Sequence, residues 1–316
     1  MTRVAAVDCG TNSIRLLVAD VPAGGAHTDL LRRMEVVRLG QGVDATGRLA
    51  PEAIERTRKV LVEYAAAARE LGATAVRMVA TSATRDAVNR ADFEDMVVEV
   101  LGQRPDVVPG REEADLSFLG ATASLDAAAR AHGTPPPAAP FLVVDIGGGS
   151  TEFVLGDGAG VRAARSVDIG CVRMTERHLH GDPPTAEQIR RAEDDIRAAL
   201  DDVRAEVPVA QAASLVGLAG SVTTVAALAL ELPAYDADAI HGSRISVDAV
   251  RAVTADLLAA TRERRAAMPV MHPGRVDVIG AGALVLRVLM DEFGMGEVVV
   301  SEHDILDGIA LRLARA

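Results

Sequence analysis

The stretch VAAVDCGTNSIRLLVAD (Val4–Asp20) reappears in altered form 137 positions later as FLVVDIGGGSTEFVLGD (Phe141–Asp157). Each copy predicts an apolar strand, an Asp, a turn of Gly and small hydroxyl residues, and a second apolar strand, which is the pattern of a β-hairpin. The backbone N–H groups of such a turn, together with one carboxylate, suit an anion or a metal ion. We therefore expect each copy to form half of a phosphate site. Aligned without a gap, the copies share Val7/Val144, Asp8/Asp145, Gly10/Gly147, Ser13/Ser150 and Asp20/Asp157.

The charged residues of the two copies are their most informative positions. Asp8 and Asp145 each follow an apolar strand and precede a turn glycine, where paired carboxylates commonly hold a divalent cation. A single Asp at a strand end is also an ordinary turn former, but its repetition favours function. Arg15 in the first copy stands where Glu152 stands in the second, so we expect the two copies to have unequal roles.

The length and composition favour a two-domain globular protein. A chain of 316 residues accommodates two domains of about 150 residues each, which agrees with one hairpin copy in each half, facing each other across a cleft. No run reaches the ~18 apolar residues of a membrane span, and no secretion signal precedes the first strand. Two cysteines are too few for a disulfide framework, and we expect a cytoplasmic protein.

The charge of the chain excludes several kinds of partner. A net charge of −12 argues against general binding to nucleic acid or to an anionic membrane, because such surfaces need an excess of basic residues. The only lysine, Lys59, has no glycine-rich loop before it, so the chain has no P-loop. With no Trp, two Tyr and five Phe, it also lacks aromatic platforms for stacking bases. An anionic substrate must therefore be held locally, by arginines and backbone N–H groups.

Strands alternate with helices along the rest of the chain, which predicts an α/β fold. The segment Gly133–Pro140 (GTPPPAAP) resembles a linker. Thr185 and Gln188 form a capping-box pattern for a helix that continues to about Glu206. Further strands are expected around 30–39, 76–80, 106–108, 160–169, 215–218 and 298–301, and further helices over 51–71, after 81–85, over 111–131, 246–264 and 275–293, and from 304 onward.

Two further motifs have both a functional and a structural interpretation. GLAGSVTT (Gly217–Thr224) follows a strand and opens a helix, so its small residues either bring the backbone close to a phosphate or allow tight helix packing. Glu112 and Glu113 open a helix after a Pro-Gly turn, where acidic residues are favoured for ordinary helix stability. The residues alone leave both alternatives open.

Seven motifs occur in an order that resembles the exopolyphosphatase/guanosine pentaphosphate phosphohydrolase (Ppx/GppA) family in its short, two-domain form. They are DCGTNSIRLLVADV, ATSATRDAVN, PGREEADLSFLGA, VVDIGGGSTEFVLG, VGLAGSVTTVAAL, IHGSRIS and RVDVIGAGALVL. The resemblance covers essentially the whole chain. It implies two actin-like (ribonuclease H-like) domains of the actin, sugar-kinase and heat-shock-chaperone superfamily, the first over 1–125 completed by a helix at 303–316, and the second over 126–302.

The resemblance also implies roles for individual residues. Glu113 would be the general base that activates the attacking water. Asp145 and Glu152 would orient water and Mg²⁺, and Asp8 would share the metal. Arg15 would hold the terminal phosphate of the substrate.

Other positions would bind substrate phosphates. They are the first turn, Gly10, Thr11, Asn12 and Ser13; the main phosphate loop, Gly147, Gly148, Gly149, Ser150 and Thr151; the third loop, Gly220, Ser221 and Thr223; and two arginines placed at or near the cleft, Arg85 and Arg275. The last motif, SEHDILDGIAL, departs from the family by carrying Asp304 and Asp307 where many members have a Gly and a Glu or an Arg-Glu pair.

The resemblance implies hydrolysis of a terminal phosphoanhydride with Mg²⁺ as cofactor and K⁺ as a candidate activator. The first expectation is exopolyphosphatase activity on inorganic polyphosphate. Guanosine pentaphosphate hydrolysis, as in the stringent response, uses the same chemistry and is the alternative, followed by an alarmone or nucleotide sensor with weak turnover. A kinase of the same superfamily is disfavoured because no sugar- or acetate-binding signature is present. A homodimer is a candidate assembly.

Overall fold

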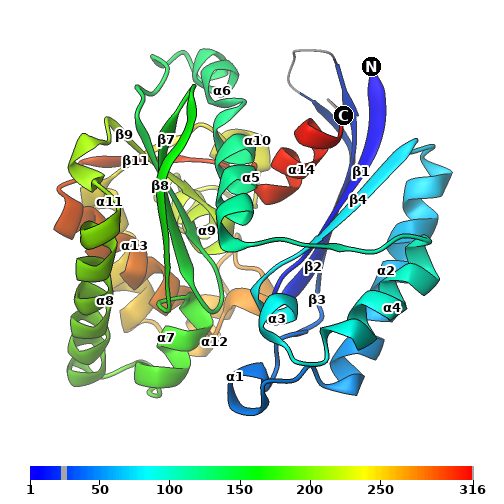
Figure 1. Ribbon diagram of the computed structural model, residues 1–316. Coiled ribbons are helices and arrows are strands. Elements are labelled where there is room, and N and C mark those ends of the chain that lie inside the picture. The colour runs from blue at the N-terminus through cyan, green and yellow to red at the C-terminus, as the bar shows by residue number, and fades with distance from the viewer. Residues whose placement is uncertain (23–26, 315–316) are drawn as a thin grey trace. The chain divides into compact units, whose positions relative to one another are not determined.

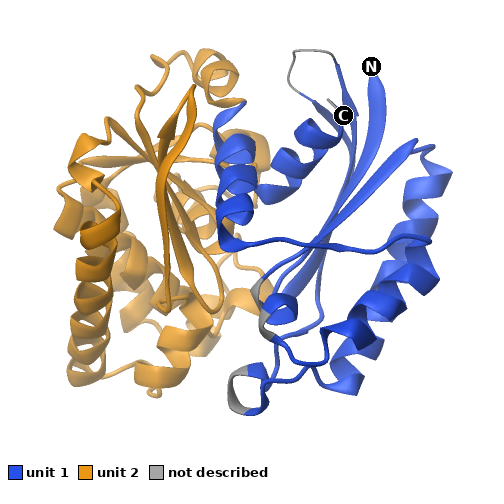
Figure 2. Ribbon diagram, in the orientation of Figure 1, with its two compact units in different colours: residues 1–123, 304–316 blue, residues 124–303 orange. Residues whose placement is uncertain are grey.

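The computed structural model describes residues 1–22 and 27–314, with the backbone alone at 44, 45, 82 and 86. The chain divides into two compact units (Figure 2). Unit 1 comprises Met1–Ala123 and Asp304–Ala316, and unit 2 comprises Ser124–His303. These limits lie within two residues of the domain boundaries expected from the resemblance. Figure 1 labels the elements of both units.

Unit 1 is built on a five-stranded sheet of order β3-β2-β1-β4-β5. β1 pairs antiparallel with β2 and parallel with β4. The strands are β1 (Thr2–Cys9), β2 (Ser13–Val21), β3 (Thr28–Val36), β4 (Ala75–Ala80) and β5 (Asp106–Val107). The helices are α1 (Val43–Thr46), α2 (Pro51–Glu70), α3 (Ser82–Asp86), α4 (Arg90–Leu101), α5 (Gly110–Thr122) and α14 (Ile305–Leu313).

The strands β1 and β2 of this sheet are buried on both faces. Alternate residues of a strand point to opposite faces, and Val7 and Leu16 accordingly join a core cluster with α2 and α4. Ala6 and Leu17 join a second cluster with α5 and α14 on the other face. Asp8 is two residues from Ala6, and Arg15 is two residues from Leu17. Their side chains therefore lie on the same face as Ala6 and Leu17, which is the face covered by α14.

α5 and α14 pack against each other at two glycines. A Cβ atom on Gly120 would lie 1.7 Å from the carbonyl oxygen of Asp304, and one on Gly308 would lie 2.0 Å from that of Leu116. Neither distance is compatible with a side chain. The close approach of the helices therefore depends on glycine at both positions.

Unit 2 repeats the strand order of unit 1 and adds one antiparallel strand, to give β10-β11-β9-β6-β7-β8. The strands are β6 (Phe141–Ile146), β7 (Thr151–Asp157), β8 (Gly160–Val167), β9 (Ser214–Leu218), β10 (Arg244–Ser246) and β11 (Glu297–Val300). The helices are α6 (Leu125–Ala131), α7 (Cys171–His178), α8 (Ala186–Glu206), α9 (Ala219–Ala229), α10 (Ala237–Ile240), α11 (Val247–Ala259), α12 (Arg262–Ala266) and α13 (Ile279–Phe293), with 3₁₀ turns η1 (Val209–Gln211) and η2 (Pro273–Arg275). The predicted capping box of Thr185 and Gln188 is confirmed.

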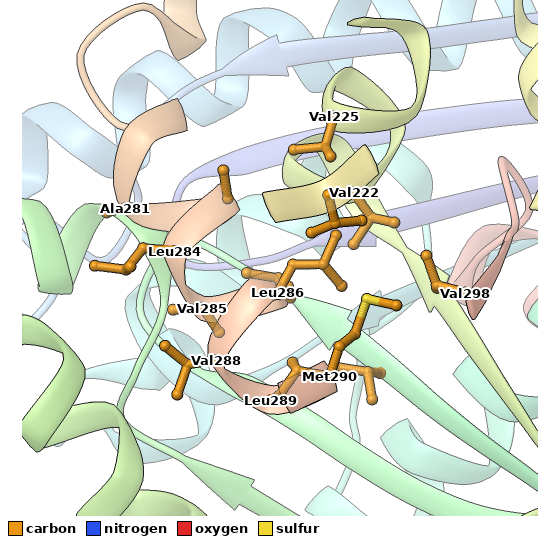
Figure 3. Packing of buried hydrophobic residues seen from close by; sticks show 14 of the residues in the cluster. Val222, Val225, Ala281, Leu284, Val285, Leu286, Val288, Leu289, Met290 and Val298 are labelled. Atoms are coloured by element: carbon orange, nitrogen blue, oxygen red, sulfur yellow. The ribbon is translucent and has the colours of Figure 1, made fainter. Parts of the chain in front are cut away.

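The core of unit 2 surrounds α13. Residues on all sides of this helix are buried, from Ile279 to Met290, as expected for a helix enclosed by protein. Figure 3 shows its side chains among Val222 and Val225 of α9 and Val298 of β11. This packing fixes the start of α9, which carries the third candidate phosphate loop.

Both predicted hairpins are confirmed, and their registers match. Asp8 lies opposite Arg15, and Asp145 lies opposite Glu152. In each turn the glycine N–H donates to the serine carbonyl oxygen, from Gly10 to Ser13 at 3.0 Å and from Gly147 to Ser150 at 3.0 Å. The sequence repeat is thus a repeat of backbone structure.

Several predicted helices have different limits in the structure. The single helix expected over 111–131 is wrong, since it divides into α5 and α6 at Ser124, whose hydroxyl forms hydrogen bonds with His241 and His303. The helix expected over 246–264 divides before Thr261, whose side chain caps α12. Arg275 lies in the turn η2 rather than in α13.

None of the helices in the described ranges is both long enough and apolar enough to cross a membrane.

Candidate functional site

The turn of the first hairpin is held by the segment that follows β3. The carbonyl oxygen of Asn12 accepts hydrogen bonds from Val37 N (3.0 Å) and Arg38 N (2.8 Å), and that of Thr11 accepts one from Gly40 N (2.8 Å). Because these carbonyl groups are engaged on one side, the turn is fixed as a rigid loop. Thr11 and Asn12 are exposed and Gly10 and Ser13 are partly buried, so the turn is accessible.

Arg15 lies between two carboxylates of unit 1. Its Nε and Nη2 donate to the same oxygen of Asp8, Oδ2, at 3.0 and 2.7 Å. Its Nη1 donates to Asp304 Oδ2. The register of the hairpin brings Asp8 to Arg15, whereas α14 supplies Asp304 from 289 positions further along the chain.

The carboxyl group of Asp8 is only 3 % exposed. Burial raises its pKa above the ordinary value, and the charge and hydrogen bonds of Arg15 act in the opposite direction. Its second oxygen, Oδ1, is buried with no hydrogen-bond partner among the described residues. Hard cations such as Mg²⁺ prefer carboxylate oxygens, so this orphaned atom fits the expected metal role.

Asp304 is also the N-cap of α14, where its Oδ1 accepts from Leu306 N at 2.9 Å. Its own N–H donates to Asp307 Oδ2 at 2.7 Å, which completes a capping box. Asp307 is fully buried and pairs with Arg32 at 2.5 Å and with His27 at 2.8 Å. Both departures from the family motif therefore anchor α14, and Asp304 also pairs with Arg15.

Glu112 and Glu113 have different partners in unit 1. Glu113 Oε2 accepts from Arg85 Nη1 at 3.1 Å, and the same Nη1 donates to the carbonyl oxygen of Val108 at 3.0 Å. Glu112 Oε1 instead accepts from Arg77 of β4 at 2.9 Å. Of the two adjacent glutamates, Glu113 is the one placed beside a predicted site arginine.

The turn of the second hairpin is held by the start of α7. The carbonyl oxygen of Gly147 accepts from Cys171 N (2.9 Å), and that of Gly148 accepts from Val172 N (2.9 Å) and Arg173 N (3.1 Å). The N–H groups of Gly148, Gly149 and Ser150 donate to no protein acceptor in the part of the chain that the structure describes. The carbonyl groups thus face α7. Turns with unengaged N–H groups of this kind can bind anions.

Glu152 receives hydrogen bonds from two serine hydroxyls. Ser150 Oγ and Ser166 Oγ donate to its Oε1 at 2.5 and 2.7 Å. Asp145, opposite it in the hairpin, is likewise partly buried, and Thr151 is buried with its hydroxyl donating to Ile169 O at 3.1 Å. Asp145 and Glu152 belong to the sheet face opposite the unit 2 core.

The third loop combines a close contact with buried hydroxyls. The guanidinium of Arg275 lies over Gly220, where a Cβ atom would be 2.5 Å from Cζ, and its Nη1 donates to Thr224 Oγ1 at 3.0 Å. Ser221 is buried against Gly282 of α13, and Thr223 accepts a hydrogen bond from Tyr235 at 2.7 Å. The absence of a side chain at Gly220 therefore permits the observed position of Arg275.

Within each unit, the structure brings the predicted residues together. In unit 1, Arg15 forms a hydrogen bond with Asp8, and Arg85 forms one with Glu113. In unit 2, Ser150 of the second turn forms a hydrogen bond with Glu152, and the guanidinium of Arg275 contacts Gly220. Side chains of charged residues outside the predicted set also contact it, among them those of Asp304 and Arg173. Asp304 pairs with Arg15, and Arg173 contacts the second turn. The sequence marked Asp304 only as a departure from the family motif, without indicating its partner, and gave no signal for Arg173.

Two sheets of the same strand order, each with a Gly- and Ser-containing turn between its first two strands, define an α/β protein of the actin-like class, as expected from the sequence. Within that class, the chain belongs to the Ppx/GppA phosphatase family, whose model matches residues 17–315.

The relatives and solved structures agree with this assignment. The chain is 52 % identical to Exopolyphosphatase 2 of Mycobacterium tuberculosis, with 99 % of each chain covered. The crystal structure of an exopolyphosphatase-like protein has a TM-score of 0.88 at 44 % identity, over 98 % of this chain and 97 % of the other. The Ppx/GppA phosphatase of Aquifex aeolicus has a TM-score of 0.81 at 29 % identity, over 99 % of each chain.

Proposed function

We propose that this protein is an exopolyphosphatase, a phosphoanhydride hydrolase that removes the terminal phosphate from inorganic polyphosphate. The observation that carries the proposal is the second hairpin, where a turn with outward N–H groups adjoins the carboxylates of Asp145 and Glu152. The full-length likeness to a protein named as an exopolyphosphatase supports polyphosphate over guanosine pentaphosphate.

The reaction would proceed by attack of water on the terminal phosphorus. Glu113 accepts a proton from the water, whose oxygen forms the new P–O bond while the bridging P–O bond breaks toward the shortened chain. Arg85 holds the Glu113 carboxylate through its 3.1 Å contact and so orients the base. Phosphoryl transfer depends mainly on positioning and charge neutralisation, which suits this set of groups.

The substrate phosphates would be bound by arginines and by backbone N–H groups of the turns. Arg15 binds the terminal phosphate, and the turns Gly10–Ser13 and Gly147–Thr151 supply backbone N–H groups. Arg275 and the loop at Gly220 hold a further phosphate. Asp8, Asp145 and Glu152 would hold Mg²⁺, which supplies positive charge against the phosphate oxygens.

One side-by-side assay tests the proposal. Purified protein is given Mg²⁺ with polyphosphate of defined lengths or with guanosine pentaphosphate, and released phosphate is measured. We expect rapid release from polyphosphate and loss of release with a chelator. Preferential release from guanosine pentaphosphate would contradict the substrate, and release from neither would favour a sensor.

A further inference from the structure

Arg265 of α12 is a buried arginine that the proposed mechanism does not use. Only 7 % of the residue is exposed, which is rare for a charged side chain unless its donors are satisfied. Its Nε donates to the carbonyl oxygen of Val276 at 3.0 Å, and its Nη1 donates to those of Ala260 at 2.9 Å and Leu257 at 3.3 Å. Its Nη2 lies 3.3 Å from Oδ1 of Asp182. The guanidinium therefore ties together three separate segments of unit 2.

The carbonyl groups that accept from Arg265 place it between the end of α11 and the turn η2. Ala260 is the C-cap of α11, and the last carbonyl groups of a helix have no partner within the helix. Val276 directly follows Arg275 in the chain and is the C-cap of η2. Because a guanidinium is planar and its donors point in fixed directions, Arg265 sets the position of η2 relative to α11.

Arg275 depends on a fixed backbone, because its side chain fits closely against the third loop. A Cβ atom on Gly220 would lie 2.5 Å from its Cζ, and its Nη1 donates to Thr224 Oγ1 at 3.0 Å. A shift of η2 would therefore move the guanidinium against the loop or away from it. The hydrogen bond from Arg265 to the residue after Arg275 opposes such a shift.

We propose that Arg265 is a positioning residue that holds Arg275 at the Gly220 loop in the orientation that binds a substrate phosphate. This inference rests on the proposed function, since Arg275 binds phosphate there only as part of that proposal.

Two neighbours of Arg265 in α12 provide matched controls. Arg264 is exposed, and Arg264→Gln removes a charge at the adjacent position. Arg262 Nε donates to Asp277 Oδ1 at 2.6 Å and so also contacts the segment after Arg275, but both side chains are exposed (60 and 61 %), so water screens this pair. Arg262→Gln therefore removes an exposed ion pair at the same segment and leaves the buried contact in place.

The experiment measures Kd for tripolyphosphate by calorimetry in a double-mutant cycle of Arg265 and Arg275. All proteins carry Glu113→Gln, which slows consumption of the ligand. Arg275→Gln should raise Kd about tenfold, the effect of one lost charged hydrogen bond. Arg265→Lys keeps the charge but loses the planar set of donors, so Arg275 is misplaced and Kd should rise about fivefold. When Arg275→Gln is already present, Arg265→Lys should change Kd by less than about twofold, as should each control variant.

Support of the fold alone would not produce this coupling between the two arginines. An equal rise in Kd for Arg265→Lys with and without Arg275→Gln would overturn the inference, and so would an unchanged Kd for Arg265→Lys. If Arg265→Lys does not fold, the cycle is run with Asp182→Asn, which weakens the hold on the Arg265 guanidinium. We then expect about a twofold rise in Kd that disappears with Arg275→Gln, and no rise would overturn the inference.

The cycle also separates this inference from the proposed function. If the two arginines are coupled in Kd but the wild type releases no phosphate from polyphosphate, the proposed function fails and the positioning role stands. If the wild type releases phosphate but Arg275→Gln leaves Kd unchanged, the positioning role alone fails. If neither binding of tripolyphosphate nor release of phosphate is observed, both fail.

Discussion

The two hairpins have the same backbone but opposite chemistry at one paired position. In the first, Arg15 lies opposite Asp8 and also donates to Asp304, so a cation meets two carboxylates. In the second, Glu152 lies opposite Asp145 and receives two serine hydroxyls. The segments that hold the two turns also differ: a loop after β3 holds the first turn, and the start of α7 holds the second.

The duplicated hairpins kept the geometry of the turn, while the strand position beside it diverged. A β-hairpin fixes which side chains lie opposite each other, so one substitution exchanges an arginine for a glutamate without moving the backbone. Under the proposed mechanism, the first copy binds the substrate and the second prepares the reaction.

Exchanging the two charges is the most severe test of this division. In the double variant Arg15→Glu/Glu152→Arg, a third carboxylate would join Asp8 and Asp304, and an arginine would face Asp145. We expect kcat/KM for polyphosphate to fall about 10³-fold or more, as for loss of a phosphate-neutralising arginine. Steady-state kinetics of the double and both single variants measure this effect. Full activity of the double variant would refute unequal roles.

Loss of the proposed base should have the next largest effect. Glu113→Gln keeps the shape of the side chain but cannot accept a proton, so we expect turnover to fall about 10²-fold or more while tripolyphosphate still binds. Glu112→Gln is the adjacent control, because Glu112 pairs with Arg77 instead. Similar turnover in the two variants would remove Glu113 from its role.

The close packing of α14 on α5 can be tested at a glycine that is not itself a site residue. Gly308→Ala would place a methyl group 2.0 Å from the Leu116 carbonyl oxygen, so the helices must separate. Overpacking of this kind typically costs about 1–3 kcal/mol of unfolding free energy. Denaturant unfolding compares it with Gly110→Ala, whose methyl group would meet nothing within 4 Å. Equal stability of the two would exclude the glycine contact as a constraint.

The smallest predicted effect concerns pH. Burial opposes protonation of His27, but hydrogen bonds to Asp29 and Asp307 outweigh it and raise its pKa to about 9. Arg32 also faces these carboxylates. Because the folded pKa lies above the ordinary value of 6.5, the stabilisation is complete below about pH 6.5 and is lost as the pH rises through 9.

We therefore expect the wild type to lose about 2 kcal/mol of unfolding free energy between pH 6.5 and 9.5, a change that His27→Gln should lack. Chemical unfolding across this pH range measures both proteins. A wild-type decrease that persists unchanged in His27→Gln would assign it to other groups.

The sequence predicted those features that depend on local pattern. The hairpins and their turns followed from alternating apolar residues interrupted by Asp, Gly and Ser, and the cap of α8 followed from Thr185 and Gln188. The division between α5 and α6 was not predictable, because Ser124 is stabilised there by His241 and His303, far away in the sequence.

Local sequence pattern was also insufficient to predict the contacts of the site residues. Helix-start preference applies equally to Glu112 and Glu113, and only β4 and α3, which bring Arg77 and Arg85, give them different partners. The link between Arg15 and Asp304 spans 289 positions, so no local pattern could indicate it. Family resemblance, rather than spacing, singled out Glu113.

The close crossing of α5 and α14 has a consequence for biosynthesis. Unit 2 is continuous in sequence, whereas unit 1 needs a helix that leaves the ribosome only after all of unit 2 has been translated. Until then, the apolar face formed by Ala6, Leu17 and Leu116 lacks its cover from α14. Unit 1 can therefore complete its core only after α14 has been synthesised. The ion pair between Arg15 and Asp304 forms only when α14 docks.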